Sequence, residues 1–315
     1  MSKKYLIILP AFVLAFIAVE VLIGNILGFP KYGVLYKMKG MRSTSGHQNV
    51  YKPYSKYWNA KGKFEIYKRN NLGLPGADVD VAADSKYICV LGSSFIENMY
   101  IKPELMSTTV LQNRLKAVDK HYNVLNLGYN GYDPYDCLRR MVYYEQTYKP
   151  GYVMLVINSY NSDSYKLIEK PFDINPASMY ADNSFKSNAN IFLRNNSAFI
   201  RLVAVLFQNG EEQTVLPPTN TPPDEEPYLT DLEICLNGFT KRYGDNFVCL
   251  AILGDSIANR KLDHFCFENN INFEYSNLMT PENQIDGDWH LNAKGNAALG
   301  DFLYESYRKH FISNK

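Results

Sequence analysis

The sequence predicts a three-layer α/β/α domain built on a mostly parallel sheet, with one apolar helix ahead of it. From residue 86 onward, short apolar runs alternate with stretches of helical spacing, and several runs end in Gly, Ser or Asn. Continuous apolar runs are typical of parallel strands buried on both faces, and the connections between such strands are helices. A third observation predicts the separate helix, because residues 5–28 form an almost uninterrupted apolar run.

The overall composition is that of an ordinary globular protein. Its 315 residues are 46% hydrophobic and 21% charged, and this length allows one large domain or two small ones. The net charge of +1, with no run of basic residues, argues against a nucleic-acid binder. The five cysteines show neither CxxC pairing nor the spacing of a zinc site, so we expect buried free thiols and no metal centre.

The N-terminal run "YLIILPAFVLAFIAVEVLIGNILG" is long enough to cross a hydrocarbon core of about 30 Å as a helix. Two lysines precede it, as in a signal sequence, and no small-x-small cleavage site follows it. Pro10 and Glu20 interrupt the run, at a cost that its many large apolar residues can offset. We therefore predict a retained signal anchor over residues 1–28 and a single-pass membrane protein whose domain lies outside the cytoplasm. The basic residues on either side leave the orientation ambiguous.

Residues 29–64 are polar and punctuated by Gly and Pro, and they predict a stalk and a lead-in to a domain over residues 65–315. The first half of that domain predicts a strand at 87–91, a helix at 107–118, a strand at 122–128, a helix at 133–148 and a strand at 152–158. The second helix has the strongest start signal, with Asp133 as its N-cap and Pro134 at its first helical position.

An insertion is predicted over residues 165–228, between the third and fourth strands. Its apolar stretch at 191–207 is interrupted by arginines and asparagines, which favours an amphipathic helix packed on the domain over a second membrane span. Residues 216–227 form a Pro-rich, acidic linker. The remaining elements are predicted as a helix at 226–244, a strand at 247–253, a helix at 258–270, a strand at 271–278 and a last helix at 292–310.

Candidate chemistry gathers at the ends of the first three strands, where an open α/β sheet binds its ligands. The first strand ends in "GSSF", which contains Ser94. The second leads into "NLGYNGYD", whose glycines Gly128 and Gly131 allow a backbone amide to face a ligand. The third leads into "INSYNSDSY", in which Asn158 and Asn161 can donate side-chain hydrogen bonds. Each segment alone is also typical of an ordinary turn or helix cap.

The C-terminal segment "DGDWHLNAKG" adds an imidazole, His290, between a helix and the two acids Asp286 and Asp288. A serine, an imidazole and a carboxylate are the parts of an enzyme with a hydroxyl nucleophile. Amide groups of glycine and asparagine stabilise the oxyanion that forms during acyl transfer. The segments together therefore predict acyl-transfer chemistry.

In this order, the four segments resemble the four blocks of the SGNH (GDSL-type) hydrolase family, named for Ser, Gly, Asn and His. Upstream, "NNLGLPG" resembles the segment that precedes the first strand in many bacterial members, so the resemblance covers about residues 65–310. It implies the following roles: Ser94 as nucleophile, His290 as base, Asp288 as the partner of the base, and Gly131 and Asn161 as oxyanion donors together with the Ser94 amide.

The sequence departs from the family pattern in three places. Ser93 stands where the family has an aspartate before the nucleophile. The third block lacks a clean Asn-Asp pair, so Asn158 remains an alternative to Asn161. Asp286 remains a fallback for Asp288, because a glycine occupies the usual position of the aspartate three residues before the histidine.

The resemblance implies a serine esterase that needs no metal or organic cofactor and acts on acyl esters, O-acetyl esters on carbohydrates among them. With a membrane anchor, an ester on an envelope glycan or lipid becomes the substrate hypothesis. Two alternatives stay open: an O-acetyltransferase that uses the same residues, and a catalytically degenerate SGNH fold that serves as a binding or scaffold module. The 25 tyrosines suit half-buried positions as well as sugar stacking.

Overall fold

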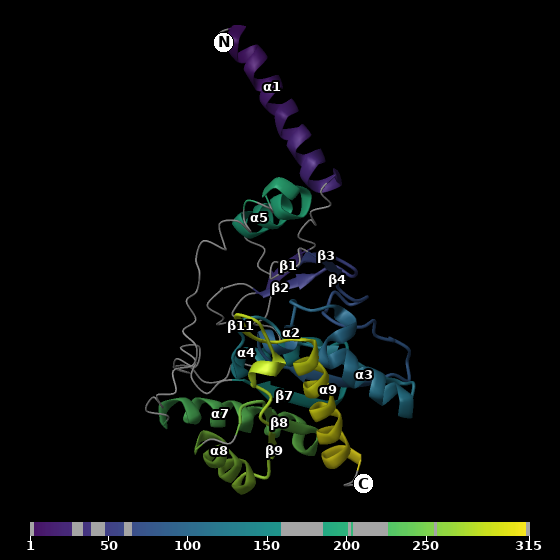
Figure 1. Ribbon diagram of the computed structural model, residues 1–315, viewed down its shortest axis with the longest axis vertical. Helices are drawn as coiled ribbons and strands as arrows, with labels where there is room; N and C mark the ends of the chain where they lie inside the picture. Colours follow the sequence, from purple (N-terminus) through teal and green to yellow (C-terminus); the bar gives the residue numbers. More distant parts are fainter. Residues whose placement is uncertain are drawn as a thin grey trace.

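In the described part of the chain, five parallel strands form the central sheet, in the order β6-β5-β7-β8-β9 (Figure 1). The computed structural model describes residues 3–26, 34–38, 48–59, 65–158, 185–200, 203, 226–254 and 257–312. The strands of the sheet are β5 (Lys86–Leu91), β6 (Tyr122–Asn126), β7 (Pro150–Ile157), β8 (Phe247–Ala251) and β9 (Asn272–Tyr275). The parallel sheet predicted from the apolar runs is confirmed.

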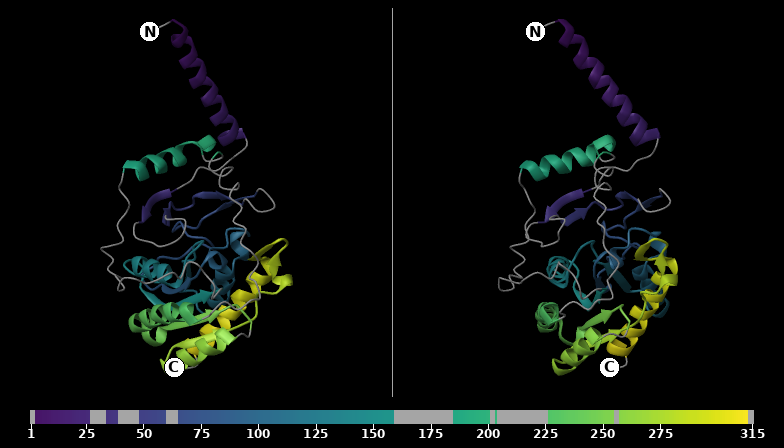
Figure 2. Two further views of the ribbon diagram at one scale, coloured as in Figure 1. Left: turned by 90° about the vertical axis from the view of Figure 1, so that its left-hand side faces the viewer. Right: turned by 60° about the vertical axis from the view of Figure 1, so that its left-hand side comes forward.

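Helices cover both faces of this sheet (Figures 1 and 2). One face is covered by α3 (Ser107–Val118) and α9 (Ala293–Tyr307), and the other by α4 (Pro134–Tyr144), α7 (Glu226–Tyr243) and α8 (Ile257–Glu268). Successive strand residues alternate between the two faces, so Ile88 and Val90 pack toward α3 and α9 while Cys89 and Leu91 pack toward α4 and α7. The predicted three-layer arrangement is therefore confirmed.

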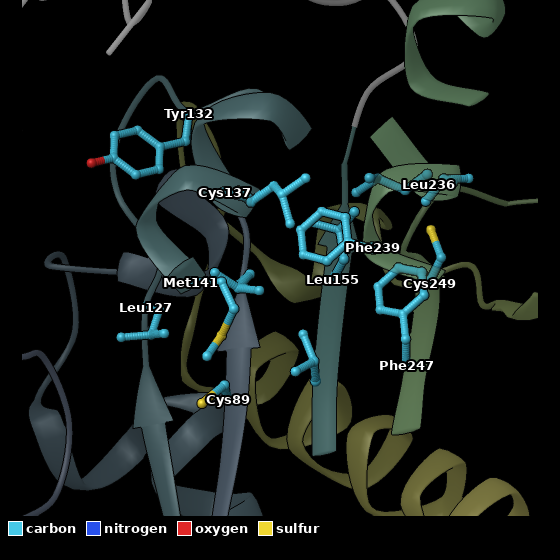
Figure 3. Close-up of a cluster of buried hydrophobic side chains, with 14 of the residues drawn as sticks. Cys89, Leu127, Tyr132, Cys137, Met141, Leu155, Leu236, Phe239, Phe247 and Cys249 are labelled. Carbon is cyan, nitrogen blue, oxygen red and sulfur yellow. The ribbon is translucent and has the colours of Figure 1, made fainter. Parts of the chain in front are cut away.

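The larger apolar cluster lies between the sheet and helices α4, α7 and α8 (Figure 3). Within it the rings of Phe239 and Phe247 stack with centroids 4.8 Å apart and planes 7° from parallel. Each fully buried side chain of this size contributes about 1.5–3 kcal/mol to folding. All five cysteines are buried and free, as the sequence predicted.

The strand order places the end of β5 at the point where the chain changes direction across the sheet. The connection from β5 leads outward to the edge strand β6, and β7 then pairs on the opposite side of β5. Such a switch point is where open α/β sheets form their binding crevice. In register, Val90 pairs with Asn126 and Leu91 with Leu155, so the segments after all three strands emerge at one edge.

Helix ends follow the local signals of the sequence. The side chain of Asp133 accepts a hydrogen bond from Asp136 N at 2.7 Å, and Pro134 occupies the first turn of α4. At the start of α9, the Asn292 side chain accepts from Gly295 N at 2.9 Å. Gly244 follows α7 with a φ of +54°, a conformation that favours glycine.

Several short elements were not predicted. They are the paired strands β1 (Val34–Met38) and β2 (Gln48–Tyr51), β3 (Lys56–Trp58) and β4 (Ile66–Lys68), and β10 (Gln284–Ile285) and β11 (Asp288–Leu291), with helix α2 (Ser94–Glu97) and the short turns η2 (Pro103–Leu105), η5 (Gly244–Asn246), η6 (Pro281–Asn283) and η7 (Arg308–Ile312). The stretch predicted as a stalk therefore contributes strands. It also packs on the domain, because Tyr57 is buried and Asn59 Nδ2 donates to Tyr100 O at 2.8 Å.

The N-terminal apolar run forms helix α1 (Lys3–Glu20) and the π-helical turn η1 (Val21–Ile26), and α1 extends away from the sheet (Figures 1 and 2). Across the described residues, none of the helices combines the length and the apolar character needed to span a bilayer. The transmembrane helix predicted within residues 1–28, and with it the membrane anchor, is thus not supported. Charged residues stand at both ends of α1, two lysines at its start and Glu20 at its end.

The insertion contains helix α5 (Phe185–Asn196), which lies near the base of α1 (Figure 1). Glu20 joins the two segments, since its carboxylate accepts hydrogen bonds from Ser197 Oγ, from Ala198 N at 2.9 Å and from Phe199 N at 3.1 Å. The single helix predicted at 191–207 is divided in its described part, because α5 ends at Asn196, Ser197 is not helical and a new helical turn begins at residue 198. The rest of the insertion, including most of the Pro-rich linker, lies outside the described residues.

Candidate active site

A tight turn at the end of β5 holds the predicted nucleophile. A Cβ on Gly92 would lie 2.6 Å from Ile96 Cγ1 and 2.9 Å from Val156 O, so a side chain does not fit there. Ser94 is the first residue of α2, and the helix closes through hydrogen bonds from Ile96 N and Glu97 N to Ser93 O. The Ser94 side chain is consequently fixed at the carboxyl edge of the sheet, with only 6% of the residue exposed.

The short hairpin of β10 and β11 brings His290 to this serine. His290 Nε2 lies 2.8 Å from Ser94 Oγ, and Nδ1 lies 2.6 Å from Asp288 Oδ1. The same carboxylate oxygen accepts from His290 N at 3.0 Å, which fixes the carboxylate relative to the ring. A neutral imidazole that donates from Nδ1 to Asp288 can accept the Ser94 proton at Nε2. Asp286, the fallback, is exposed.

Three aromatic rings enclose the His290 imidazole. Phe95 stacks on it at 5.3 Å, Trp289 lies at 4.9 Å and Tyr100 at 4.5 Å between ring centroids. With His290 only 5% exposed, the apolar surroundings strengthen its hydrogen bonds. Sequence reasoning did not identify these rings. Phe95 and Trp289 could have been found as neighbours of the motif residues, whereas nothing in the sequence pattern singles out Tyr100.

Gly131, the predicted oxyanion glycine, lies in a turn over residues 129–132 that is closed by a hydrogen bond from Tyr132 N to Tyr129 O at 3.2 Å. Its φ of +75° is in the left-handed region, which explains the glycine at this place. Within the described part of the chain, the backbone amides of Gly131 and Ser94 have no hydrogen-bond acceptor. Both amides are therefore able to donate to a ligand.

Of the two candidate asparagines in the third segment, the structure describes Asn158 only. Asn158 follows β7, and its Oδ1 accepts a hydrogen bond from Ser93 Oγ at 2.7 Å. Ser93 thereby ties the end of β5 to the end of β7. Because Oδ1 faces Ser93, the amide nitrogen is the end of Asn158 that remains to donate. Asn161 lies outside the described residues.

A buried acid close to Ser94 was not identified from the sequence. Glu97 is 8% exposed, and its Oε2 accepts from Asn130 N at 2.8 Å. Burial raises the pKa of Glu97, while Arg69, the Asn130 amide and Arg140 each oppose that rise. Burial likewise raises the pKa of Tyr100 to about 12, with the charges of Glu97 and Asp288 adding to it. No motif marks Glu97, because its surroundings come from distant segments.

In the described part of the chain, no three His, Cys, Asp or Glu side chains cluster in a way that could hold a metal ion.

Comparison with known proteins gives matches in structure only. No family model and no curated protein sequence matches the chain. Among solved structures, the psychrotrophic esterase EstA from Pseudoalteromonas sp. matches with a TM-score of 0.41 and 13% identity, over 71% of this chain and 98% of that one. A lipolytic protein of the G-D-S-L family from Veillonella parvula matches with a TM-score of 0.37 and 11% identity, over 72% and 98%.

A catalytic mutant of the acetylxylan esterase Axe2 from Geobacillus stearothermophilus matches with a TM-score of 0.38 and 13% identity, over 71% of this chain and 93% of that one. These neighbours are esterases or GDSL-family proteins, but scores and identities this low carry no argument about activity.

Proposed function

We propose that this protein is a serine esterase of the SGNH type, which transfers an acyl group from an ester to water. The observation that carries the proposal is the continuous hydrogen-bonded chain from Ser94 Oγ through His290 to Asp288, with links of 2.8 and 2.6 Å. A hydroxyl becomes a nucleophile when a base accepts its proton and a third group orients that base.

In the proposed reaction, His290 Nε2 takes the Ser94 proton as Oγ attacks the ester carbonyl carbon. Asp288 stabilises the imidazolium that forms. The tetrahedral intermediate then collapses, the C–O bond of the leaving alcohol breaks, and His290 returns the proton to that alcohol. A water molecule, deprotonated by the same imidazole, attacks the acyl-enzyme and releases the acid and free Ser94.

The oxyanion would be stabilised by the amides of Ser94 and Gly131 and by the side chain of an asparagine. Asn158 and Asn161 both remain candidates for that side chain, and the hydrogen bond from Ser93 supports Asn158. General base catalysis contributes about 10²–10⁴-fold, and each oxyanion donor about 10²–10³-fold, to reactions of this kind.

For the substrate we propose an acyl ester with an apolar face, O-acetyl esters of carbohydrates among them. Support comes from the aromatic rings of Tyr100 and Trp289 beside the imidazole, since aromatic faces pack against the apolar faces of sugars and acyl chains. The location outside the cytoplasm, which was inferred from residues 1–28, remains a prediction.

A fluorophosphonate probe tests the proposal directly, because it labels only an activated serine. We expect labelling of the wild-type protein, loss of labelling in Ser94→Ala, and retained labelling in Ser93→Ala, the matched neighbouring serine. No labelling of the folded wild-type protein would favour the scaffold alternative. Acetate release from an aryl acetate, measured with and without a glycan acceptor, then separates hydrolysis from acetyl transfer.

A further inference from the structure

The loop that carries Gly131 packs directly against the helix that carries Ser94. Tyr129 N donates to Gly92 O at 3.1 Å, and Asn126 Nδ2 donates to Ile96 O at 2.7 Å. A Cβ on Gly128 would lie 2.3 Å from Glu97 N, which shows how closely the two backbones approach. Any shift of this loop therefore changes the distance between the Gly131 amide and the nucleophile.

Glu97 holds the turn at residues 129–132 from the side of α2. It is the last residue of the helix that Ser94 begins, and its carboxyl oxygen accepts from the amide of Asn130, the residue immediately before Gly131. The side chain is buried, so water does not compete for this hydrogen bond. A single residue thus links the nucleophile helix to the amide next to the oxyanion glycine.

Arg140 holds the same turn from the side of α4. Its guanidinium carbon lies 5.4 Å from the ring centre of Tyr129 and 5.7 Å from that of Tyr132, the residues at the two ends of the turn. Nη1 donates to the Tyr132 hydroxyl at 3.4 Å, and Arg140 is only 3% exposed. The attraction of a cation to an aromatic face is stronger in a desolvated site than at an exposed one.

We propose that Glu97 and Arg140 are positioning residues, which hold the turn from its two sides and so place the Gly131 amide where the oxyanion develops. This inference rests on the proposed esterase function and assigns residues that support it without touching the reacting atoms. The Glu97 role needs an acceptor oxygen rather than a negative charge, because Oε2 accepts from Asn130 N in either protonation state. A glutamine can therefore replace it.

Kinetics with an aryl acetate test the catalytic consequence. We expect Glu97→Ala to lower kcat about 10–100-fold with KM within about twofold, because a misplaced donor weakens binding of the transition state and not of the substrate. Glu97→Gln should stay within about fivefold of the wild type. Glu104→Ala serves as the matched control, since Glu104 is an exposed acid on the neighbouring η2, and it should leave kcat unchanged. Unchanged kcat in Glu97→Ala would overturn the inference.

Hydrogen exchange of the peptide covering residues 127–133 tests the positioning independently of activity. Exchange should accelerate in Glu97→Ala, stay near the wild-type rate in Glu97→Gln, and be unaffected in Glu104→Ala. Tyr132→Phe removes only the hydrogen bond to Arg140 and should also accelerate exchange, which keeps the test available if Glu97→Ala does not fold. If the wild-type protein had no esterase activity but the variants showed these exchange changes, only the proposed function would be refuted. Equal exchange in all variants would refute the positioning role.

Discussion

Two aspartates flank Gly287, and the structure places them differently with respect to the imidazole. Asp288 Oδ1 lies 2.6 Å from His290 Nδ1, whereas Asp286 is exposed. Gly287 has a φ of +71°, so the chain turns sharply between the two acids and directs them to different surroundings. The turn of the β10–β11 hairpin therefore determines which carboxylate contacts the imidazole.

This difference makes a matched pair of variants informative. Asp288→Asn should lower kcat of aryl acetate hydrolysis about 10³–10⁴-fold, because the amide no longer holds the tautomer with Nε2 free to accept a proton. Asp286→Asn should leave kcat within about twofold. If kcat fell by a similar factor in both variants, the contact between Asp288 and His290 would not be the one that supports catalysis.

We expect Glu97 to make the stability of the protein depend on pH. Burial raises its pKa above the ordinary value of 4.5, although Arg69, Arg140 and the Asn130 amide oppose the rise, with the hydroxyls of Tyr57 and Tyr100 also close by. The folded state therefore binds the Glu97 proton more tightly than the unfolded state. Stability from this group is greatest below about pH 4.5 and falls as pH rises through the raised pKa.

Glu97→Gln removes this dependence. Relative to the wild type, the variant should gain free energy of unfolding as pH increases above about 4.5, by about 1.4 kcal/mol for each tenfold difference in proton affinity between the two states. Urea unfolding of both proteins at several pH values between 4 and 8 measures the difference. If the difference in free energy of unfolding between the two proteins stayed constant across this pH range, folding would not raise the pKa of Glu97.

At the scale of the elements, Glu20 is the contact that joins α1 to the segment after α5. Its carboxylate accepts from the hydroxyl and backbone amides at the start of the helical turn at 198–200, and the rings of Phe16 and Phe199 meet edge to face with centroids 6.0 Å apart. An acid at a helix start satisfies free amides and interacts favourably with the helix dipole. The charge that interrupts the apolar run thus caps a neighbouring helix.

Removing this cap should loosen the contact locally. We expect Glu20→Ala to cost about 1 kcal/mol and to speed hydrogen exchange of the peptide covering residues 197–200. Glu20→Gln keeps acceptor oxygen and should have a smaller effect. The peptide of α3, which makes no contact with Glu20, provides the internal control. Equal exchange at residues 197–200 in all three proteins would count against the capping role.

The long elements could be predicted from the sequence, and the short ones could not. Helix α3 has the predicted bounds of 107–118, and the strands of the central sheet lie within a few residues of their predicted positions. Strands β1 to β4, β10 and β11 contain only two to five residues each. This is too few to show the alternation of apolar and polar residues that is typical of a strand. Their pairing depends on partners elsewhere in the chain.

At the scale of the whole molecule, packing of the helices on the sheet buries all five cysteines away from solvent. Cys89 and Cys249 lie on the sheet, and Cys137, Cys235 and Cys266 lie on the helices that cover it. Burial raises the pKa of the Cys266 thiol to about 12 and that of the Cys89 thiol further. Protonated, buried thiols are poor nucleophiles.

The folded protein should therefore react very slowly with a thiol reagent, and all five cysteines should react once the chain is unfolded. Counting modified thiols with and without denaturant measures this, and the rate in dilute denaturant should follow global unfolding. Rapid modification of one thiol in the native protein would show that part of the core opens locally.

The sequence by itself determined the central architecture and the candidates for chemistry. Buried strands and amphipathic helices differ in local period, so the alternation of the two could be read along the chain. Ser94, Gly131 and His290 could be predicted because their segments resemble the blocks of the SGNH family. The roles of these residues remain predictions, although the structure brings Ser94 and His290 within hydrogen-bond distance.

Only the tertiary structure decided which aspartate meets the imidazole, that Ser93 pairs with Asn158, and that Glu97 and Arg140 contact the turn of Gly131. The turn at Gly287 separates the two aspartates. The contacts of Ser93 with Asn158 and of Glu97 with Asn130 bridge 65 and 33 positions of the chain. Local period carries no information about such distances, because they are set by how whole layers pack.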